Sequence, residues 1–282
     1  MKHSETERLS VLDANKHVHS FLVNSGEYEK SPHFLPENKA KVRAILHQLS
    51  NQLSHTNRMI DFGCGTGFIL DLTHDLFQEV VGVDITKDMM NKVDMSPGNI
   101  KLVESLAENT PFDSESFDLA TAYSFMDHLY NYIDFLEESF RLLKPGGIFY
   151  SDLNPNRDFI SSVNEIELQN QPELSAVISK EIKGALHNGR YYKDEFGLDP
   201  ILLEKAEPIK TNCMGFCAIE ILEQAKKIGF TTCKVEYEWY ANQGAVKHLQ
   251  PEGDEKIIDT YLKSMLPLSS GLFKYLRFIF IK

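Results

Sequence analysis

The stretch MIDFGCGTGFIL at residues 59–70 joins an apolar run carrying one acid to three alternating glycines and a second apolar run. The first run predicts a buried strand that ends near Phe62, and the apolar residues after Gly67 predict the start of a helix. Glycines at positions 63, 65 and 67 permit a tight turn and let a ligand approach the backbone closely. This segment therefore predicts a strand, a ligand-binding loop and a helix, an order typical of an α/β protein.

Apolar runs alternate with helical stretches between Arg58 and Asp152, which predicts repeated strand-helix-strand units and a parallel sheet. We expect seven strands, at 58–62, 79–83, 100–104, 118–122, 148–152, 231–240 and 274–281. Helices are expected from Pro36 to about residue 53, and over 67–76, 87–94, 132–143 and 218–228.

Changes in composition divide the chain into four segments. Residues 1–35 are polar and rich in histidine, without a sustained apolar period, and predict an arm or lid. Residues 36–153 predict the ligand-binding core, and residues 214–282 complete its sheet. Residues 154–213 break the strand-helix rhythm and predict an insertion that packs over the sheet. Exposed strands in this insertion would be able to pair between subunits, so a homodimer stays open.

The 282 residues carry 29 basic and 41 acidic side chains, a formal net charge of −12. This acidic balance argues against nucleic acid, because binding a phosphate backbone requires a dense positive surface. No apolar run is long enough to span a membrane, and residues 1–20 do not have the pattern of a signal peptide. Four cysteines do not make a disulfide framework or a metal site, so we expect a cytoplasmic protein without a bound metal.

Two carboxylates indicate what the glycine loop binds. Asp84 ends the second apolar strand, 17 residues after Gly67, where an acid accepts hydrogen bonds from the ribose hydroxyls of a nucleoside. Asp61, beside the loop, would repel a pyrophosphate but attract an ammonium group. The spacing is not that of a dinucleotide or triphosphate loop. A ligand with an amino acid part and a nucleoside part fits both acids, and S-adenosylmethionine has both. A structural turn beside an unrelated Asp84 is the alternative.

At these residues the sequence resembles the class I S-adenosylmethionine-dependent methyltransferases, and the resemblance covers about 58–152 and 218–282. Three further landmarks carry it: the segment from Ile100 to Phe112, the segment from Phe117 to Leu129, and the turn Leu142 to Gly147. The sequence departs from the family pattern at three positions, Leu106, Thr110 and Asp127. The resemblance implies a Rossmann-like α/β fold: a seven-stranded, mostly parallel sheet with helices on both faces, an N-terminal helical arm and an insertion after the fifth strand.

The resemblance also implies the site. The residues expected to bind the cofactor are Tyr28, Asp61, Gly63, Cys64, Gly65, Gly67, Asp84, Ile85, Leu106, Ala107 and Tyr123. His128 is the candidate for a catalytic base, since it follows the fourth strand, where ligands converge. Methyl transfer to a small-molecule acceptor through an oxygen, nitrogen or carbon nucleophile is the implied reaction. The insertion is interpreted as a cap over the acceptor, with the polar candidates Asn154, Arg157, His187, Arg190, Tyr191, Tyr192, Asp194 and Glu195.

Three other functions are compatible with the sequence. A protein that binds S-adenosylmethionine without methyl transfer, as a sensor or partner, would account for Leu106 and Asp127. Another transfer from the same cofactor, such as aminopropyl transfer, is a second alternative. A nucleotide-dependent oxidoreductase is a third, although the loop spacing disfavours it.

Overall fold

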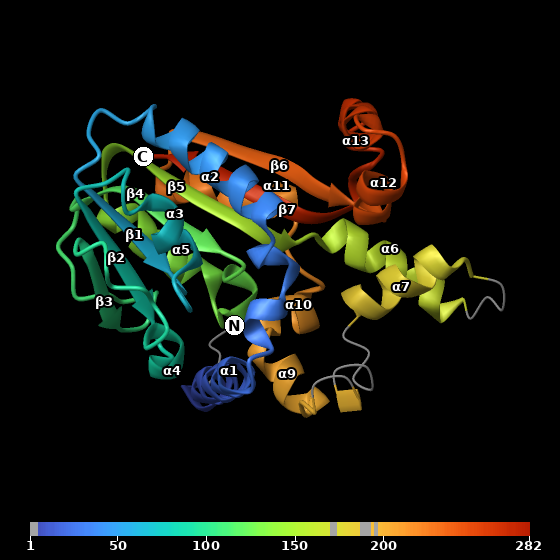
Figure 1. Cartoon of the computed structure of the whole chain (residues 1–282), viewed down its shortest axis with the longest axis horizontal. Helices are drawn as coiled ribbons and strands as arrows, with labels where there is room; N and C mark the ends of the chain where they lie inside the picture. Colours follow the sequence, from blue (N-terminus) through green and yellow to red (C-terminus); the bar gives the residue numbers. More distant parts are fainter. Residues whose placement is uncertain (1–4, 170–173, 187–192, 195–196) are drawn as a thin grey trace.

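The computed structural model describes residues 5–169, 174–186, 193–194 and 197–282. At its centre lies one seven-stranded sheet with the order β3-β2-β1-β4-β5-β7-β6 (Figure 1). The strands are β1 (Arg58–Phe62), β2 (Glu79–Asp84), β3 (Ile100–Glu104), β4 (Phe117–Tyr123), β5 (Leu143–Pro155), β6 (Thr232–Tyr240) and β7 (Phe273–Ile281).

β1 to β5 are parallel to one another, whereas β7 runs antiparallel to both of its neighbours, β5 and β6. The mostly parallel seven-stranded sheet expected from the sequence is confirmed. β2 and β3 lie on one side of β1, while β4 and β5 lie on the other, so the strand order reverses between β1 and β4. Ligands of such sheets bind beyond the carboxyl ends of the strands at the point of reversal. The glycine loop follows β1 and therefore lies at this point.

Helices cover both faces of the sheet because successive residues of a buried parallel strand point to opposite sides. Met59 packs with Leu46 of α2 on one face, whereas Ile60 packs with Phe135 of α5 on the other. The helices are α1 (Glu5–Ser25), α2 (Pro36–Ser50), α3 (Phe68–Thr73), α4 (Lys87–Met90), α5 (Tyr132–Leu142), α6 (Arg157–Leu168), α7 (Ala176–Ala185), α9 (Pro200–Ala206), α10 (Pro208–Cys213), α11 (Ala218–Ile228), α12 (Gln243–Leu249) and α13 (Asp254–Ser264), with short 3₁₀ turns η1 (Tyr28–Lys30), η2 (Pro32–Phe34), η3 (Met126–His128) and η4 (Ser270–Leu272). None of the described helices has the length and apolar character needed to cross a bilayer.

The ends of several elements differ from the expected ones, and α2 ends at Ser50 instead of about residue 53. α3 stops at Thr73 and α4 at Met90, so both are shorter than the sequence indicates. β5 is longer, because it starts at Leu143 instead of residue 148. The turn at Gly146 and Gly147 stays in the sheet because the Gly146 amide donates a hydrogen bond to the Lys282 carbonyl, with 2.8 Å between the N and O atoms.

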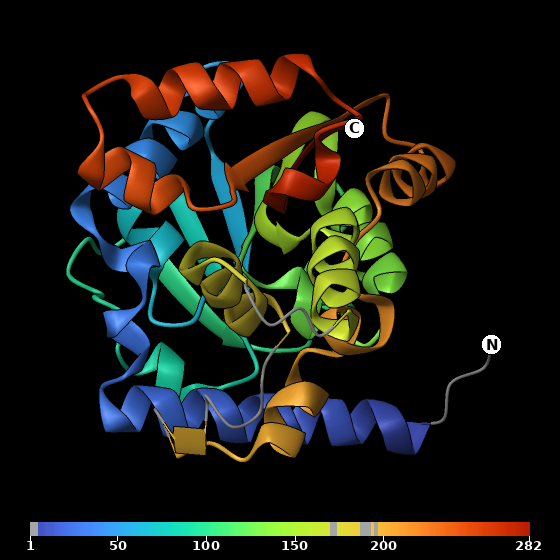
Figure 2. The same cartoon turned by 90° about the vertical axis from the view of Figure 1, so that its right-hand side faces the viewer.

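The N-terminal segment contains a helix of 21 residues, α1, where the sequence showed no sustained apolar period. Its buried apolar residues Ala14 and Val18 pack against Leu203 and Ala206 of α9. Figure 2 shows α1 and α9 lying side by side across the lower edge of the molecule. The apolar stripe is narrow because Asn15, between Ala14 and Val18, is also buried.

The described part of the insertion consists of helices, so the expectation of exposed strands there is wrong. The insertion does not pack over a face of the sheet. α6 and α7 extend beyond the carboxyl end of β5, α9 lies against α1, and α10 lies against η3 (Figure 1). The helices α9 and α10 therefore close the edge of the sheet where the glycine loop lies.

Candidate functional site

The loop after β1 requires glycine at two positions. Gly63 and Gly65 have φ of +63° and +53°, in the left-handed region that side chains disfavour. A Cβ at Gly63 would lie 2.1 Å from a ring carbon of Phe125, and one at Gly65 would lie 3.1 Å from the hydroxyl of Tyr28. The bare backbone of this loop therefore forms one wall of a narrow space.

Asp84 fastens the loop to the end of β2. Its Oδ2 accepts a hydrogen bond from the Gly65 amide at 2.9 Å, and its Oδ1 accepts one from the Thr86 amide at 2.7 Å. Both oxygens keep further lone pairs, since a carboxylate has about four acceptor sites. The carboxylate is thus held in a fixed orientation with capacity to accept bonds from hydroxyl groups.

Asp61 lies at the carboxyl end of β1 and is 2% exposed. Thr121 Oγ1 donates a hydrogen bond to its Oδ1 at 2.6 Å. Burial raises the pKa of Asp61 to about 8; the bond from Thr121 opposes this rise and the charge of Asp84 adds to it. A buried carboxyl with so high a pKa is stabilised as the carboxylate only when a positive charge comes close.

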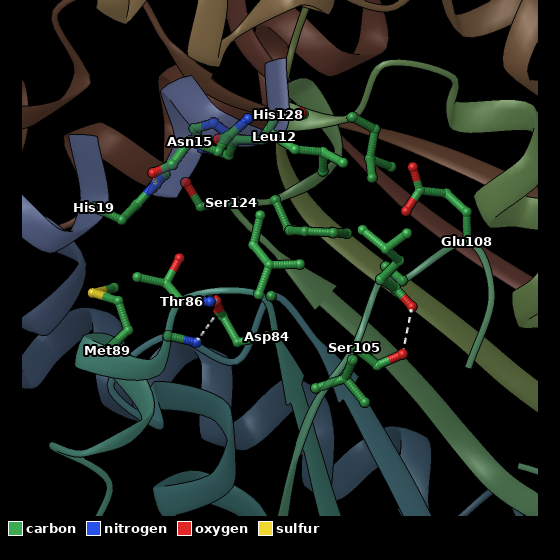
Figure 3. A pocket seen from close by; sticks show the side chains of 18 of the residues that line it. Leu12, Asn15, His19, Asp84, Thr86, Met89, Ser105, Glu108, Ser124 and His128 are labelled. Atoms are coloured by element: carbon green, nitrogen blue, oxygen red, sulfur yellow. Dashed lines mark hydrogen bonds between the residues drawn. The ribbon is translucent and has the colours of Figure 1, made fainter. Parts of the chain in front are cut away.

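A first cavity extends from the loop along the ends of β2 and β3 to α1. In Figure 3, His19 and Asn15 of α1 face Asp84 and Thr86 across this space. Eight of the predicted site residues line it: Tyr28, Gly63, Gly65, Asp84, Ile85, Leu106, Ala107 and His128.

A second cavity, of about 390 Å³, continues from the first beneath η1 and η2. Asp61, Cys64 and Tyr123 line this cavity together with Tyr28, so it contains the remaining predicted cofactor residues with one exception. Gly67 lines neither cavity. It precedes α3 with φ of +91°, and a Cβ there would lie 3.1 Å from a methyl carbon of Val93, so its glycine serves the backbone and its packing.

Aromatic rings form a wall of the second cavity. The centroids of Tyr28 and Phe34 lie 5.7 Å apart, those of Phe34 and Phe68 5.6 Å, and those of Phe68 and Tyr123 4.9 Å. The Tyr123 hydroxyl accepts a bond from Asn38 Nδ2 at 2.9 Å. Burial raises the pKa of both tyrosines, so both hydroxyls are neutral. This wall shields the space beside Asp61 from water.

His128 lies where the two cavities meet. Its Nδ1 is 2.9 Å from the Ala206 carbonyl oxygen, and this contact places a proton on Nδ1, so the neutral form of the ring has its lone pair on Nε2. Burial alone would lower the pKa of His128, but the charges of Asp127 and Glu207 raise it. The ring of His19 lies 4.9 Å away, edge to face, and burial together with the charge of His128 lowers the pKa of His19 to about 4.

Beyond His128 lies an acidic cluster that the sequence did not indicate. Ligand atoms of Asp127, His128 and Glu207 all lie within 4.8 Å of one another. Asp127 Oδ1 is buried and has no hydrogen-bond partner among the described residues. The three residues come from η3 and from the start of α10, which are distant in sequence, so no local motif could indicate the cluster.

Two polar residues proposed for the cap have internal partners instead. Asn154 is buried, and its Nδ2 donates to the Leu276 carbonyl at 3.1 Å. Arg157 pairs with Glu220 at 2.7 Å. Asp194 is exposed. His187, Arg190, Tyr191, Tyr192 and Glu195 lie outside the described residues.

Comparison with known proteins places this geometry in context. Residues 60–151 match a family model described as a methyltransferase domain. The demethylmenaquinone methyltransferase of Lactococcus lactis is 29% identical over 139 residues, which cover 44% of this chain and 54% of that protein. The ubiquinone biosynthesis O-methyltransferase of Paraburkholderia phymatum is 25% identical over 159 residues, covering 46% of this chain and 68% of that protein. The chain spans about half the length of the demethylmenaquinone methyltransferases it matches.

Solved structures share the fold. A phosphoethanolamine N-methyltransferase 2 from Haemonchus contortus, in complex with phosphomonomethylethanolamine and S-adenosylhomocysteine, has a TM-score of 0.57 at 16% identity, covering 96% of this chain and 60% of that one. An S-adenosylmethionine-dependent methyltransferase from Thermotoga maritima has a TM-score of 0.53 at 19% identity, covering 95% and 99%. Identities this low establish the likeness of the folds and nothing about substrates.

Proposed function

We propose that this chain, a class I S-adenosylmethionine-dependent methyltransferase, transfers a methyl group to a small-molecule acceptor. The observation that carries the proposal is the pairing of Asp61 and Asp84 on either side of the glycine loop, at the reversal point of the sheet. One carboxylate is buried without a cationic partner among the described residues, and the other keeps free acceptor sites. This set of groups fits a ligand that carries both an ammonium and a ribose.

We assign the cofactor to the first two cavities. Asp84 would hold the ribose hydroxyls, Asp61 the ammonium group, and Leu106 with the Ala107 amide the adenine edge. Tyr28 would close over the methionine part. When bound there, the cofactor supplies a methyl group activated by its sulfonium. The chain's own contribution is alignment and exclusion of water, because the leaving group is already good.

His128 is our candidate for the base that accepts a proton from the acceptor. In the neutral ring, Nε2 carries the lone pair. The ring lines both cofactor cavities and a third cavity, which Asp127 and Glu207 also line. General base catalysis of this kind contributes roughly 10²–10⁴-fold. Residues 154–213, through α9 and α10, would form the cap that selects the acceptor.

A small acceptor is favoured by the enclosure of these cavities and by the acidic charge of the chain. Two sequence relatives are named as a demethylmenaquinone methyltransferase and a ubiquinone biosynthesis O-methyltransferase, which keeps quinone precursors in view as acceptors for this chain. We also propose a cytoplasmic location, which the four free cysteines support. Whether the chain forms a homodimer is decided by measuring its mass in solution.

The test is calorimetric titration of purified protein, freed of any ligand that copurifies, with S-adenosylmethionine, S-adenosylhomocysteine and NAD. We expect saturable binding of both sulfur nucleosides and none of NAD. Binding of NAD alone, or of none of the three, would refute the proposal. Binding without turnover on a broad acceptor panel would instead support the alternative of a cofactor-binding sensor, which Leu106 and Asp127 first suggested.

A further inference from the structure

A third cavity, of about 260 Å³, adjoins the cofactor site. It shares His33, Ser124, His128 and Glu207 with the cavity that contains Asp61, so these residues form a common boundary between the two spaces. Its other walls come from the end of β5, from α6, α7 and α10, and from the start of β7. An acceptor bound there would present its reactive atom toward the cofactor across His128.

Three carboxylates and two lysines line this cavity, together with the imidazole of His128. Lys274 pairs with Glu181 at 2.7 Å, and Lys210 pairs with Glu207 at 3.4 Å. Each lysine in the lining is thus next to a carboxylate, whereas the lining holds a third carboxylate, that of Asp127.

Asp127 is 8% exposed, and its Oδ1 has no hydrogen-bond partner within the part of the chain that the structure describes. An unsatisfied buried acceptor destabilises a folded protein, and a charged one does so more strongly. The carboxyl of Asp127 therefore destabilises the ligand-free protein. A ligand that brings hydrogen-bond donors and positive charge would stabilise it. An ammonium ion provides both, whereas a hydroxyl group provides one donor and no charge.

On the basis of the proposed function, we infer that the methyl acceptor is a primary or secondary amine, which binds as its ammonium ion against Asp127 and Glu207. This inference names the substrate class that the sequence left open. The aromatic side chains Phe159 and Tyr275 line the same cavity and support it, because ammonium ions bind well against aromatic faces.

The reaction then proceeds with balanced charge. The ammonium group gives one proton to Nε2 of His128 and becomes a neutral amine. The nitrogen lone pair forms the new N–C bond as the C–S bond breaks, and the electron pair of that bond remains on sulfur. The products are an N-methylammonium ion and the neutral thioether S-adenosylhomocysteine, and His128 releases its proton to solvent. Asp127 acts in this step by binding the ammonium group beside His128, whose ring is held by the Ala206 carbonyl.

The first test measures binding without turnover. Protein saturated with S-adenosylhomocysteine is titrated with phenylethylamine, tryptamine and butylamine, and with phenylethanol, tryptophol and butanol as partners of the same carbon skeleton. We expect at least one amine to bind about tenfold or more tightly than its alcohol, the difference that one charge-assisted hydrogen bond supplies. The variant Asp127→Asn, of nearly equal shape, should lose this preference and keep its affinity for S-adenosylhomocysteine.

Glu204→Gln is the matched control, because Glu204 is an exposed carboxylate on α9 outside all three cavities. It should bind amines like the unchanged protein. If Asp127→Asn fails to fold, Glu207→Gln replaces it in the same comparison. Equal affinity for amines and alcohols, or an amine preference that survives both cavity variants, would overturn the inference.

The second test follows the methyl group. With cofactor labelled in its methyl group, mass spectrometry of the products should find the label on nitrogen. Label found only on oxygen or carbon overturns the amine inference and leaves the proposed function intact, whereas failure to bind either sulfur nucleoside removes both. A divalent ion that binds the chelator-treated protein and is lost in Asp127→Asn would make the cluster a metal site and would also overturn the inference.

Discussion

Asp61 should release a proton when the cofactor's ammonium group binds. Burial holds the pKa of this carboxyl at about 8 in the free protein, so at pH 7 about nine-tenths of the molecules carry the proton. An ammonium ion beside the group favours its charged form and lowers the pKa well below 7. Binding of S-adenosylhomocysteine, which keeps this ammonium, should therefore expel about 0.9 proton at pH 7.

The assay is calorimetric titration in two buffers whose ionisation enthalpies differ. The difference between the two heats gives the number of protons released, and Asp61→Asn removes the group that supplies them. The variant should release about 0.9 fewer protons at pH 7. Asp71→Asn, an exposed acid on α3, is the matched control and should behave like the unchanged protein.

A second substitution tests the cause of the shift. Thr121→Val keeps the shape of the side chain but removes the hydrogen bond that stabilises the Asp61 carboxylate. The pKa of Asp61 should rise further, so proton release at pH 8 should increase. The reasoning is refuted if Asp61→Asn and the unchanged protein release equal numbers of protons at pH 7 while both bind the ligand.

Other perturbations give separate tests. Asp84→Ala should weaken binding of S-adenosylhomocysteine by about 1.5–3 kcal/mol, measured by titration, and an unchanged Kd would remove this residue from the site. Gly63→Ala should destabilise the protein by about 2–4 kcal/mol in urea unfolding, since it adds a clash with Phe125 to the left-handed strain of roughly 1–2 kcal/mol. Gly146 has φ of +79°, and a Cβ added there would meet no atom within 4 Å. Gly146→Ala should therefore lower the unfolding free energy only by the left-handed strain of roughly 1–2 kcal/mol. Burial alone would raise the pKa of Glu238, but Arg277, Lys41 and Lys263 lower it to about 2. Glu238 therefore stabilises the folded state fully above the pKa that it has in the unfolded chain, and this stabilisation is lost as the pH falls toward 2. Glu238→Gln should abolish this acid dependence of the unfolding free energy; a persisting slope of the same size would contradict the assignment.

The core of the fold could be predicted from the sequence because its determinants are local. The strand, the three glycines and the helix that follow one another from residue 59 to 70 impose a backbone path that few other arrangements allow. The alternation of strands with helices along the chain then predicts a parallel sheet. Gly67 shows what the sequence alone does not distinguish. A glycine needed for its positive φ and a glycine needed for close approach of a ligand look the same in the sequence.

α1 could not be predicted with the same assurance because its inner face is not apolar. Asn15 and His19 lie on the side that faces the cofactor cavity, and Asn15 Nδ2 donates to the His128 carbonyl at 3.2 Å. A helix that lines a polar cavity interrupts its apolar period wherever it meets that cavity. The acidic cluster was hidden for another reason, because Asp127 and Glu207 are 80 positions apart and meet only through tertiary packing.

Two buried carboxyls lie on either side of His128, and neither forms a salt bridge with a lysine or arginine among the described residues. Asp61 has one hydroxyl donor, and Asp127 Oδ1 has none among the described residues. Residues of this kind lower the stability of the free protein, so their presence is understandable where ligands supply the missing charge. A ligand that binds only the folded state returns that stability. The two carboxyls then have different partners: the ammonium of the cofactor for Asp61, and the ammonium of the acceptor for Asp127. Because His128 lies between them, the site is arranged to bring two cations to its opposite sides and to remove one proton from the second.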